Sequence, residues 1–92
     1  MSSSLDEYRC ILINKILFAN SQEEVKHLGD AAMKALLNHK LNEHIIARFV
    51  KKVISELEQF NAMEKDAQQW SNIQMAKIQF NRIKYRISTS VN

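Results

Sequence analysis

The chain lacks the residues that most often interrupt helices. It has 92 residues, no proline and a single glycine, Gly29. Proline and glycine are the strongest signals for helix ends and tight turns, so their scarcity favours long helices joined by short connections. The sequence therefore predicts an all-α protein that folds as one domain over residues 1–92, with residues 1–4 and 88–92 frayed.

The scarcity of cysteine and the lack of long apolar runs indicate the cellular compartment in which the protein is expected. A single cysteine, Cys10, cannot form an internal disulfide, and its apolar neighbours predict a small buried side chain. No apolar run approaches the ~20 residues of a transmembrane helix. Asp6 and Glu7 stand where a secretory signal peptide carries positive charge. We therefore expect a cytoplasmic protein in a reducing compartment.

Acidic residues are missing from the C-terminal quarter of the chain. The formal net charge is +3, and no Asp or Glu follows Asp66. Four basic residues do follow it, namely Lys77, Arg82, Lys84 and Arg86. This local excess of positive charge is the clearest electrostatic signal in the sequence.

Apolar residues recur at helical spacing through most of the chain. Ser21 and Glu24 have the spacing of a capping box, and Asn42 is a good N-cap residue before the strongest apolar stripe. Because connections of three to five residues make successive helices antiparallel, we predict a small up-and-down bundle of three to four helices. The predicted helices span residues 5–19, 22–38, 43–60 and 64–87.

Two alternatives to this assignment stay open at the level of sequence. Residues 9–18 are apolar enough to form a buried β-strand, although nothing else in the chain is a partner for it. Residues 43–87 could also form one long helix. The apolar face after Asn72 is rotated about twice as far as a straight heptad helix allows, which favours a break at Asn61 to Asp66.

No pattern of residues points to catalysis, a cofactor or a metal. Glu24 and His27 have the i, i+3 spacing of a di-iron helix, but such sites need two of these motifs. His39 and His44 flank a turn, and two imidazoles do not complete a zinc site. We therefore predict a protein that is not an enzyme, has no cofactor and has no evident small-molecule substrate.

Two segments look too apolar for a small monomer to cover. Residues 10–18 and 45–57 are apolar over more than one helical face, which favours a homo-oligomer such as a dimer, or another helical protein as partner. Trp70 either plugs one end of the bundle or anchors an interface. The predicted partner contacts are Ile13, Leu17, Phe18, Ile54 and Trp70.

The basic C-terminal segment offers an alternative function. Lys77, Arg82, Lys84 and Arg86 stand in a segment that also contains Phe80 and Tyr85, and such mixtures are common in nucleic-acid or anionic-surface binding proteins. At ~100° per residue, however, they lie on both sides of the apolar stripe and form no single cationic face. The sequence thus predicts a non-catalytic helical module for self-association or partner binding, with anion binding as the weaker alternative.

Overall fold

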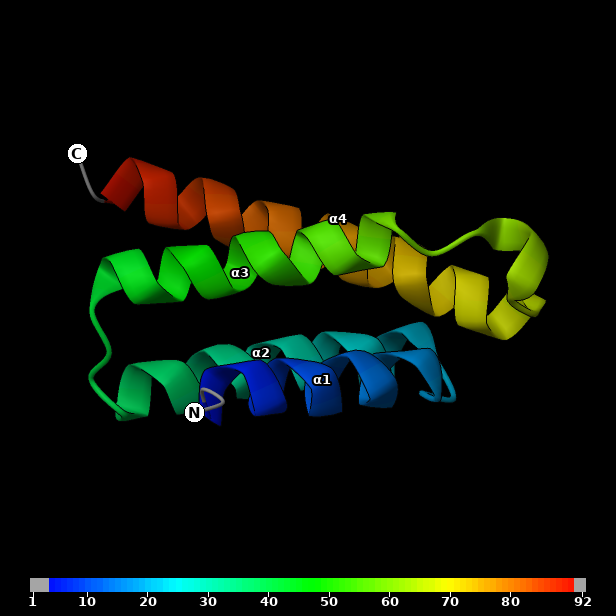
Figure 1. Cartoon of the computed structure of the whole chain (residues 1–92), viewed down its shortest axis with the longest axis horizontal. Coiled ribbons are helices and arrows are strands. Elements are labelled where there is room, and N and C mark those ends of the chain that lie inside the picture. Colours follow the sequence, from blue (N-terminus) through cyan, green and yellow to red (C-terminus); the bar gives the residue numbers. More distant parts are fainter. Residues whose placement is uncertain (1–3, 91–92) are drawn as a thin grey trace.

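A computed structural model describes the backbone of residues 4–90 and the side chains of residues 5–87. Within these residues the chain forms four α-helices and one short 3₁₀ helix, and no β-strand. Successive helices run in opposite directions along the bundle (Figure 1). The elements are α1 (Ser4–Leu17), α2 (Gln22–Asn38), α3 (Glu43–Glu58), the 3₁₀ helix η1 (Ala62–Glu64) and α4 (Ala67–Ser90).

The predicted all-α bundle is confirmed, and two alternatives are wrong. Residues 9–17 lie in α1 and form no strand, and residues 43–87 form two helices instead of one. The ends of the described chain are helical at Ser4 and at residues 88–90, where the sequence predicts fraying. The rest of that prediction concerns residues 1–3 and 91–92, which lie outside the described residues.

Between α3 and α4 the helix is interrupted, and the side chains of Asn61 and Asp66 accept hydrogen bonds from backbone amides there. Asn61 accepts a hydrogen bond from the Met63 amide at 3.0 Å and starts η1. Asp66 accepts one from the Gln69 amide at 2.8 Å, and the Gln69 side chain accepts one from the Asp66 amide. Because this reciprocal pair is a capping box, α4 begins at Ala67, three residues after the predicted start.

The other two helix starts follow the predicted caps. The Ser21 hydroxyl accepts a hydrogen bond from the Glu24 amide at 3.1 Å, and Asn42 accepts one from the His44 amide at 2.7 Å. Between α2 and α3 the chain turns at Lys40, which has a φ of 54°. Each cap satisfies a backbone amide in the first turn of its helix, where that amide has no partner within the helix.

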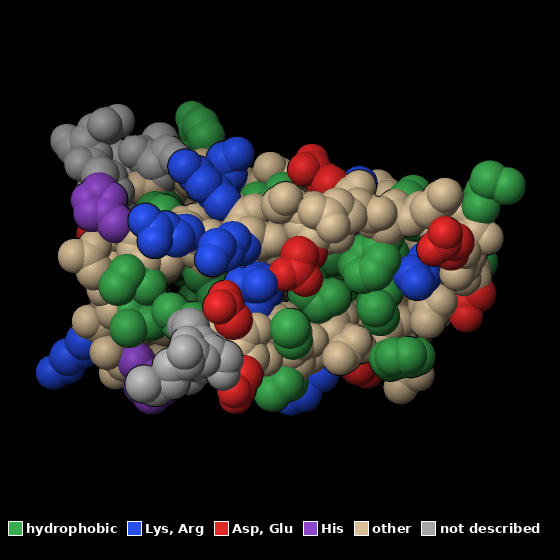
Figure 2. Space-filling view, in the orientation of Figure 1, with side chains coloured by type: hydrophobic (Ala, Val, Ile, Leu, Met, Phe, Trp, Pro, Cys, Tyr) green, Lys and Arg blue, Asp and Glu red, His purple; other side chains and the backbone are tan. Residues whose placement is uncertain are grey.

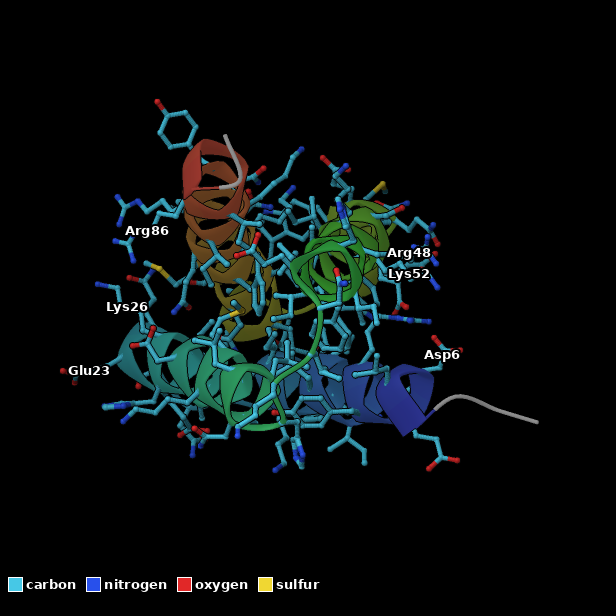
Figure 3. The ribbon with its side chains drawn as sticks, turned by 90° about the vertical axis from the view of Figure 1, so that its left-hand side faces the viewer. Asp6, Glu23, Lys26, Arg48, Lys52 and Arg86 are labelled. Atoms are coloured by element: carbon cyan, nitrogen blue, oxygen red, sulfur yellow. The ribbon has the colours of Figure 1, made fainter. Side chains whose placement is uncertain are left out.

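The helices pack in two layers. Seen along the bundle in Figure 3, α1 and α2 lie side by side beneath α3 and α4. The last helix, α4, packs against each of the other three and reaches across the diagonal of the bundle to α1. It is therefore the element on which the tertiary structure depends most.

One core runs through the centre of the bundle and contains three residues that the sequence predicts at a partner interface. Ile13, Leu17 and Ile54 are 5%, 9% and 6% exposed, so that prediction is wrong for them. Helix α3 turns a wide apolar face toward both α1 and α4, and this bundle covers it without a partner. The remaining large core residues are Leu12, Ile16, Val25, Leu36, Ile46, Phe49, Val50, Val53, Leu57, Ile73 and Phe80.

A buried asparagine joins α4 to the end of α1. Asn72 has no exposed surface, and its side-chain amide donates hydrogen bonds to the carbonyls of Leu17 and Ala19 at 3.3 and 2.8 Å. Its oxygen accepts one from Gln68 at 3.0 Å. The carbonyls at a helix C-terminus have no partner within their own helix. Asn72 supplies that partner from a distant part of the sequence.

Cys10 is exposed, so the prediction of a buried thiol is wrong. The core side of α1 is occupied by Leu12, Ile13 and Ile16, and Cys10 lies on the opposite side with Ile11 and Phe18. Because a helix presents a new face every 100°, an apolar run of nine residues must place some members in solvent.

Candidate functional site

The structure divides the four predicted basic residues between two sides of α4. The Lys77 ammonium lies over the ring of Trp70, with its nitrogen 5.8 Å from the ring centroid. Lys84 is exposed, while Arg82 and Arg86 line a groove together with residues of α2. The structure thus pairs only Arg82 and Arg86 in one site.

The groove lies between α2 and α4 and has a volume of ≈ 170 Å³. Lys26 from α2 joins Arg82 and Arg86 at its edges, so three cations surround it. Figure 3 shows Lys26 and Arg86 extending from the two helices on the same side of the bundle. The apolar part of the lining comes from Met75, Ile78 and Ile83.

Gln79 lines this groove and packs against Gly29 of α2. The Gln79 side chain lies against Gly29, where an added Cβ would come within 2.6 Å of the amide. Its nitrogen donates hydrogen bonds to the Lys26 carbonyl at 2.9 Å and to the Asp30 carboxylate at 3.2 Å. The missing side chain at Gly29 therefore allows α4 to approach α2 closely, and the side chain that approaches it is polar.

The lining of the groove contains more cations than carboxylates. Its lining contains the cations of Lys26, Arg82 and Arg86 and the single carboxylate of Asp30, which accepts a hydrogen bond from Gln79. Neither Lys26 nor Arg82 forms an ion pair with any described residue. Since α4 contributes no acidic side chain, the groove favours an anion with an apolar portion.

The two predicted partner contacts outside the core differ in exposure. Phe18 is 72% exposed at the C-terminal end of α1. Trp70 is partly buried against the core, and Lys77 covers its ring, as the plug interpretation expects. A cation over an indole face is a favourable contact of about 0.5–1 kcal/mol at an exposed site. Phe18 is thus the more accessible of the two aromatic side chains.

Two kinds of site are absent from the part of the chain that the structure describes. No three side chains of His, Cys, Asp or Glu come together there as a metal-binding group. No helix there has the length and the apolar surface needed to cross a bilayer.

Sequence reasoning missed Lys26 and Gln79 as members of the groove. Both lie on helices whose faces it identified, but Lys26 is 56 positions from Arg82 and carries no motif. Gly29 was the available signal, because a glycine inside a helix often marks a close approach. The sequence could not name the residue that approaches it.

No protein-family model, curated protein or solved structure matches this chain.

Proposed function

We propose that the protein is a non-catalytic module that binds an acidic, partly apolar segment of another protein in the groove between α2 and α4. The observation that carries this proposal is the set of three cations, Lys26, Arg82 and Arg86, around the apolar lining of Met75, Ile78 and Ile83. Charge complementarity of this kind steers a partner and fixes its register. The expectation of a cytoplasmic location stays part of the proposal.

A protein segment suits this groove better than nucleic acid. Phosphate backbones are bound by rows of cations, and each neutralised phosphate strengthens the salt dependence of binding. In this protein Lys77 lies over Trp70, and the cations of the groove surround apolar side chains instead of forming a row. A segment that alternates Glu with Leu matches the groove's cations and its apolar side chains together.

The test is a titration with a fluorescent helical peptide that carries Glu at i and i+4 and Leu on the adjoining face. Binding should weaken by about tenfold in Arg82→Glu, because a charge-assisted contact becomes repulsive. The matched control is Lys84→Glu, which makes the same charge change on the same helix outside the groove and should alter affinity less than about twofold.

Three results would contradict the proposal. The peptide could fail to bind at about 50 mM salt, the two charge reversals could weaken binding equally, or a DNA or RNA duplex could bind more tightly than the peptide. Unfolding curves of both variants show whether a loss of binding reflects a loss of fold.

Self-association is a second candidate function, supported by the outer face of α1. Ile11 and Phe18 are 51% and 72% exposed and lie seven residues apart, so they share one side of the helix. Two copies packed through antiparallel α1 helices would place each Phe18 against Ile11 of the partner. We expect light scattering to give a dimer that Phe18→Glu dissociates and that Leu37→Glu, on exposed α2 surface, leaves intact.

A further inference from the structure

A second, larger hollow lies on the opposite side of the bundle, between α1 and α3. It has a volume of ≈ 320 Å³. Figure 3 shows Asp6, Arg48 and Lys52 on this side, away from Lys26 and Arg86. Lys and Arg side chains gather over α3 on the face shown in Figure 2. This volume is at the lower end of the about 300–1,000 Å³ of small-molecule pockets, whereas the groove is smaller.

The apolar lining of the hollow is held in place by the core. Leu5, Ile45 and Phe49 contribute it. Phe49 is buried, and its ring stacks on Tyr8 with centroids 5.8 Å apart. Ile45 is 41% exposed and Leu5 is partly buried, so both keep apolar surface in contact with water. A hydrocarbon chain placed against them would remove that surface from solvent.

One of the three cations in the hollow is already neutralised. Arg9 donates hydrogen bonds to Glu56 and, at 2.7 Å, to Asp6. The bond from Arg9 lowers the pKa of Asp6, with a smaller contribution from Lys52, so this carboxylate stays ionised at neutral pH. Arg9 therefore positions Asp6 and has no remaining charge to offer an external anion.

The other two cations donate no hydrogen bond to a described carboxylate, and Lys52 forms only a long ion pair with Asp6. Arg48 forms no ion pair with any described residue, and the Lys52 nitrogen is 3.9 Å from the Asp6 carboxylate, beyond hydrogen-bond distance. They are four residues apart on α3 and therefore adjacent on its surface. A guanidinium and an ammonium side by side can bind one carboxylate through several charge-assisted hydrogen bonds.

We infer that the hollow between α1 and α3 binds a small amphipathic carboxylate, with the acid group on Arg48 and Lys52 and the hydrocarbon against Leu5, Ile45 and Phe49. This site goes beyond the proposed function, because it lies on other helices and takes a small molecule. Nothing in the sequence pointed to it, since residues 5–9 and 45–52 are far apart along the chain.

Octanoate is the probe, and NMR spectra of labelled protein report its binding. Octanoate should shift the signals of Leu5, Ile45 and Phe49 in a saturable way. Octanol and octylammonium have the same chain without the anion, and both should bind at least about tenfold more weakly. Arg48→Glu should weaken octanoate binding by about tenfold as well, whereas Lys51→Glu, with the same charge change outside the hollow, should leave it within about twofold.

Three results would contradict this inference. Equal binding of octanol would show an apolar hollow without carboxylate recognition, and equal losses in Arg48→Glu and Lys51→Glu would show only general charge attraction. Shifts confined to Ile78 and Gln79 would place the ligand in the other groove. Arg82→Glu separates this inference from the proposed function, because it should weaken peptide binding by about tenfold and leave octanoate binding unchanged.

Discussion

The two halves of α4 have different tasks although they form one continuous helix. Among residues 67–87 of α4, whose side chains are described, all the buried positions fall within 67–80, namely Asn72, Ile73, Ala76 and Phe80. Residues 81–87 contain no buried position and include the basic residues Arg82, Lys84 and Arg86. The first half supplies the buried residues, and the second half is mainly a charged surface in which only Ile83 and Ile87 pack partly against the core. Variants in the two halves should therefore have opposite effects on stability and on binding.

The largest effect is expected at Asn72. Asn72→Ala should lower the free energy of unfolding by about 3 kcal/mol, because two carbonyls at the end of α1 lose their donor and a small cavity forms. Urea unfolding measures the change. The matched control is Asn81→Ala in the second half, which loses only an exposed bond to the Lys77 carbonyl and should cost less than about 0.5 kcal/mol. Similar losses in both variants would refute the division of α4.

A smaller effect on stability is expected at Gly29 of α2, against which Gln79 packs near the boundary between the two halves of α4. Gly29→Ala should change stability by less than about 1 kcal/mol, because the gain in helix propensity offsets the displacement of Gln79. In a Gln79→Ala background the same substitution should stabilise by about 1 kcal/mol, since no side chain opposes the new methyl group. Unfolding of all four proteins gives the coupling energy. Additive effects would mean that Gln79 does not lie on Gly29 in solution.

These two sites also show how far the sequence determines the structure. The caps at Ser21 and Asn42, the helical periods and the rotated stripe after Asn72 are local signals, and they predicted the four helices and the break between α3 and α4. Contacts between distant residues have no such signal. The bonds of Asn72 to α1 and the approach of Lys26 to Arg82 depend on how finished helices pack, so the sequence identified neither.

The sequence predicted too many residues at a partner interface, and the reason is again that it does not show how the helices pack against one another. Ile13, Leu17 and Ile54 were predicted at a partner surface because their helices are apolar over a wide arc. In the folded chain α4 crosses the bundle diagonal and covers that arc. The width of an apolar face can be read from one helix, but the number of neighbours that share it cannot.

The loss of stability in acid should come from helices other than α4, because residues 67–90 contain no carboxylate side chain. Asp6 has a pKa below its ordinary value of 3.8, chiefly because Arg9 donates a hydrogen bond to it. A lowered pKa stabilises the folded state above 3.8, and this stabilisation is lost as the pH falls through the folded pKa. Asp6→Asn should therefore lose less stability than the wild type between about pH 5 and pH 3.

The control for the acid experiment is Glu58→Gln, an exposed side chain without an ion pair in the described residues. Its stability should fall with acid as steeply as that of the wild type. Urea unfolding at each pH gives the comparison. Identical acid sensitivity of Asp6→Asn and wild type would show that the bond between Arg9 and Asp6 does not persist in solution.

The smallest effect on stability is expected in the second half of α4. Arg82→Glu and Lys84→Glu remove exposed charges that form no ion pair with described residues, so each should change the free energy of unfolding by less than about 0.5 kcal/mol. Thermal unfolding measures both. A loss above about 1 kcal/mol in either variant would mean that residues 81–87 also support the fold.

The most direct test of the proposed function is an NMR map of where the acidic peptide binds on the folded protein. If the second half of α4 is a binding surface, the shifted amides should cluster at Lys26, Gln79, Arg82 and Arg86 and leave those near Asn72 unchanged. Shifts centred on Arg48 and Lys52, or spread over every exposed cation, would contradict binding in the groove between α2 and α4.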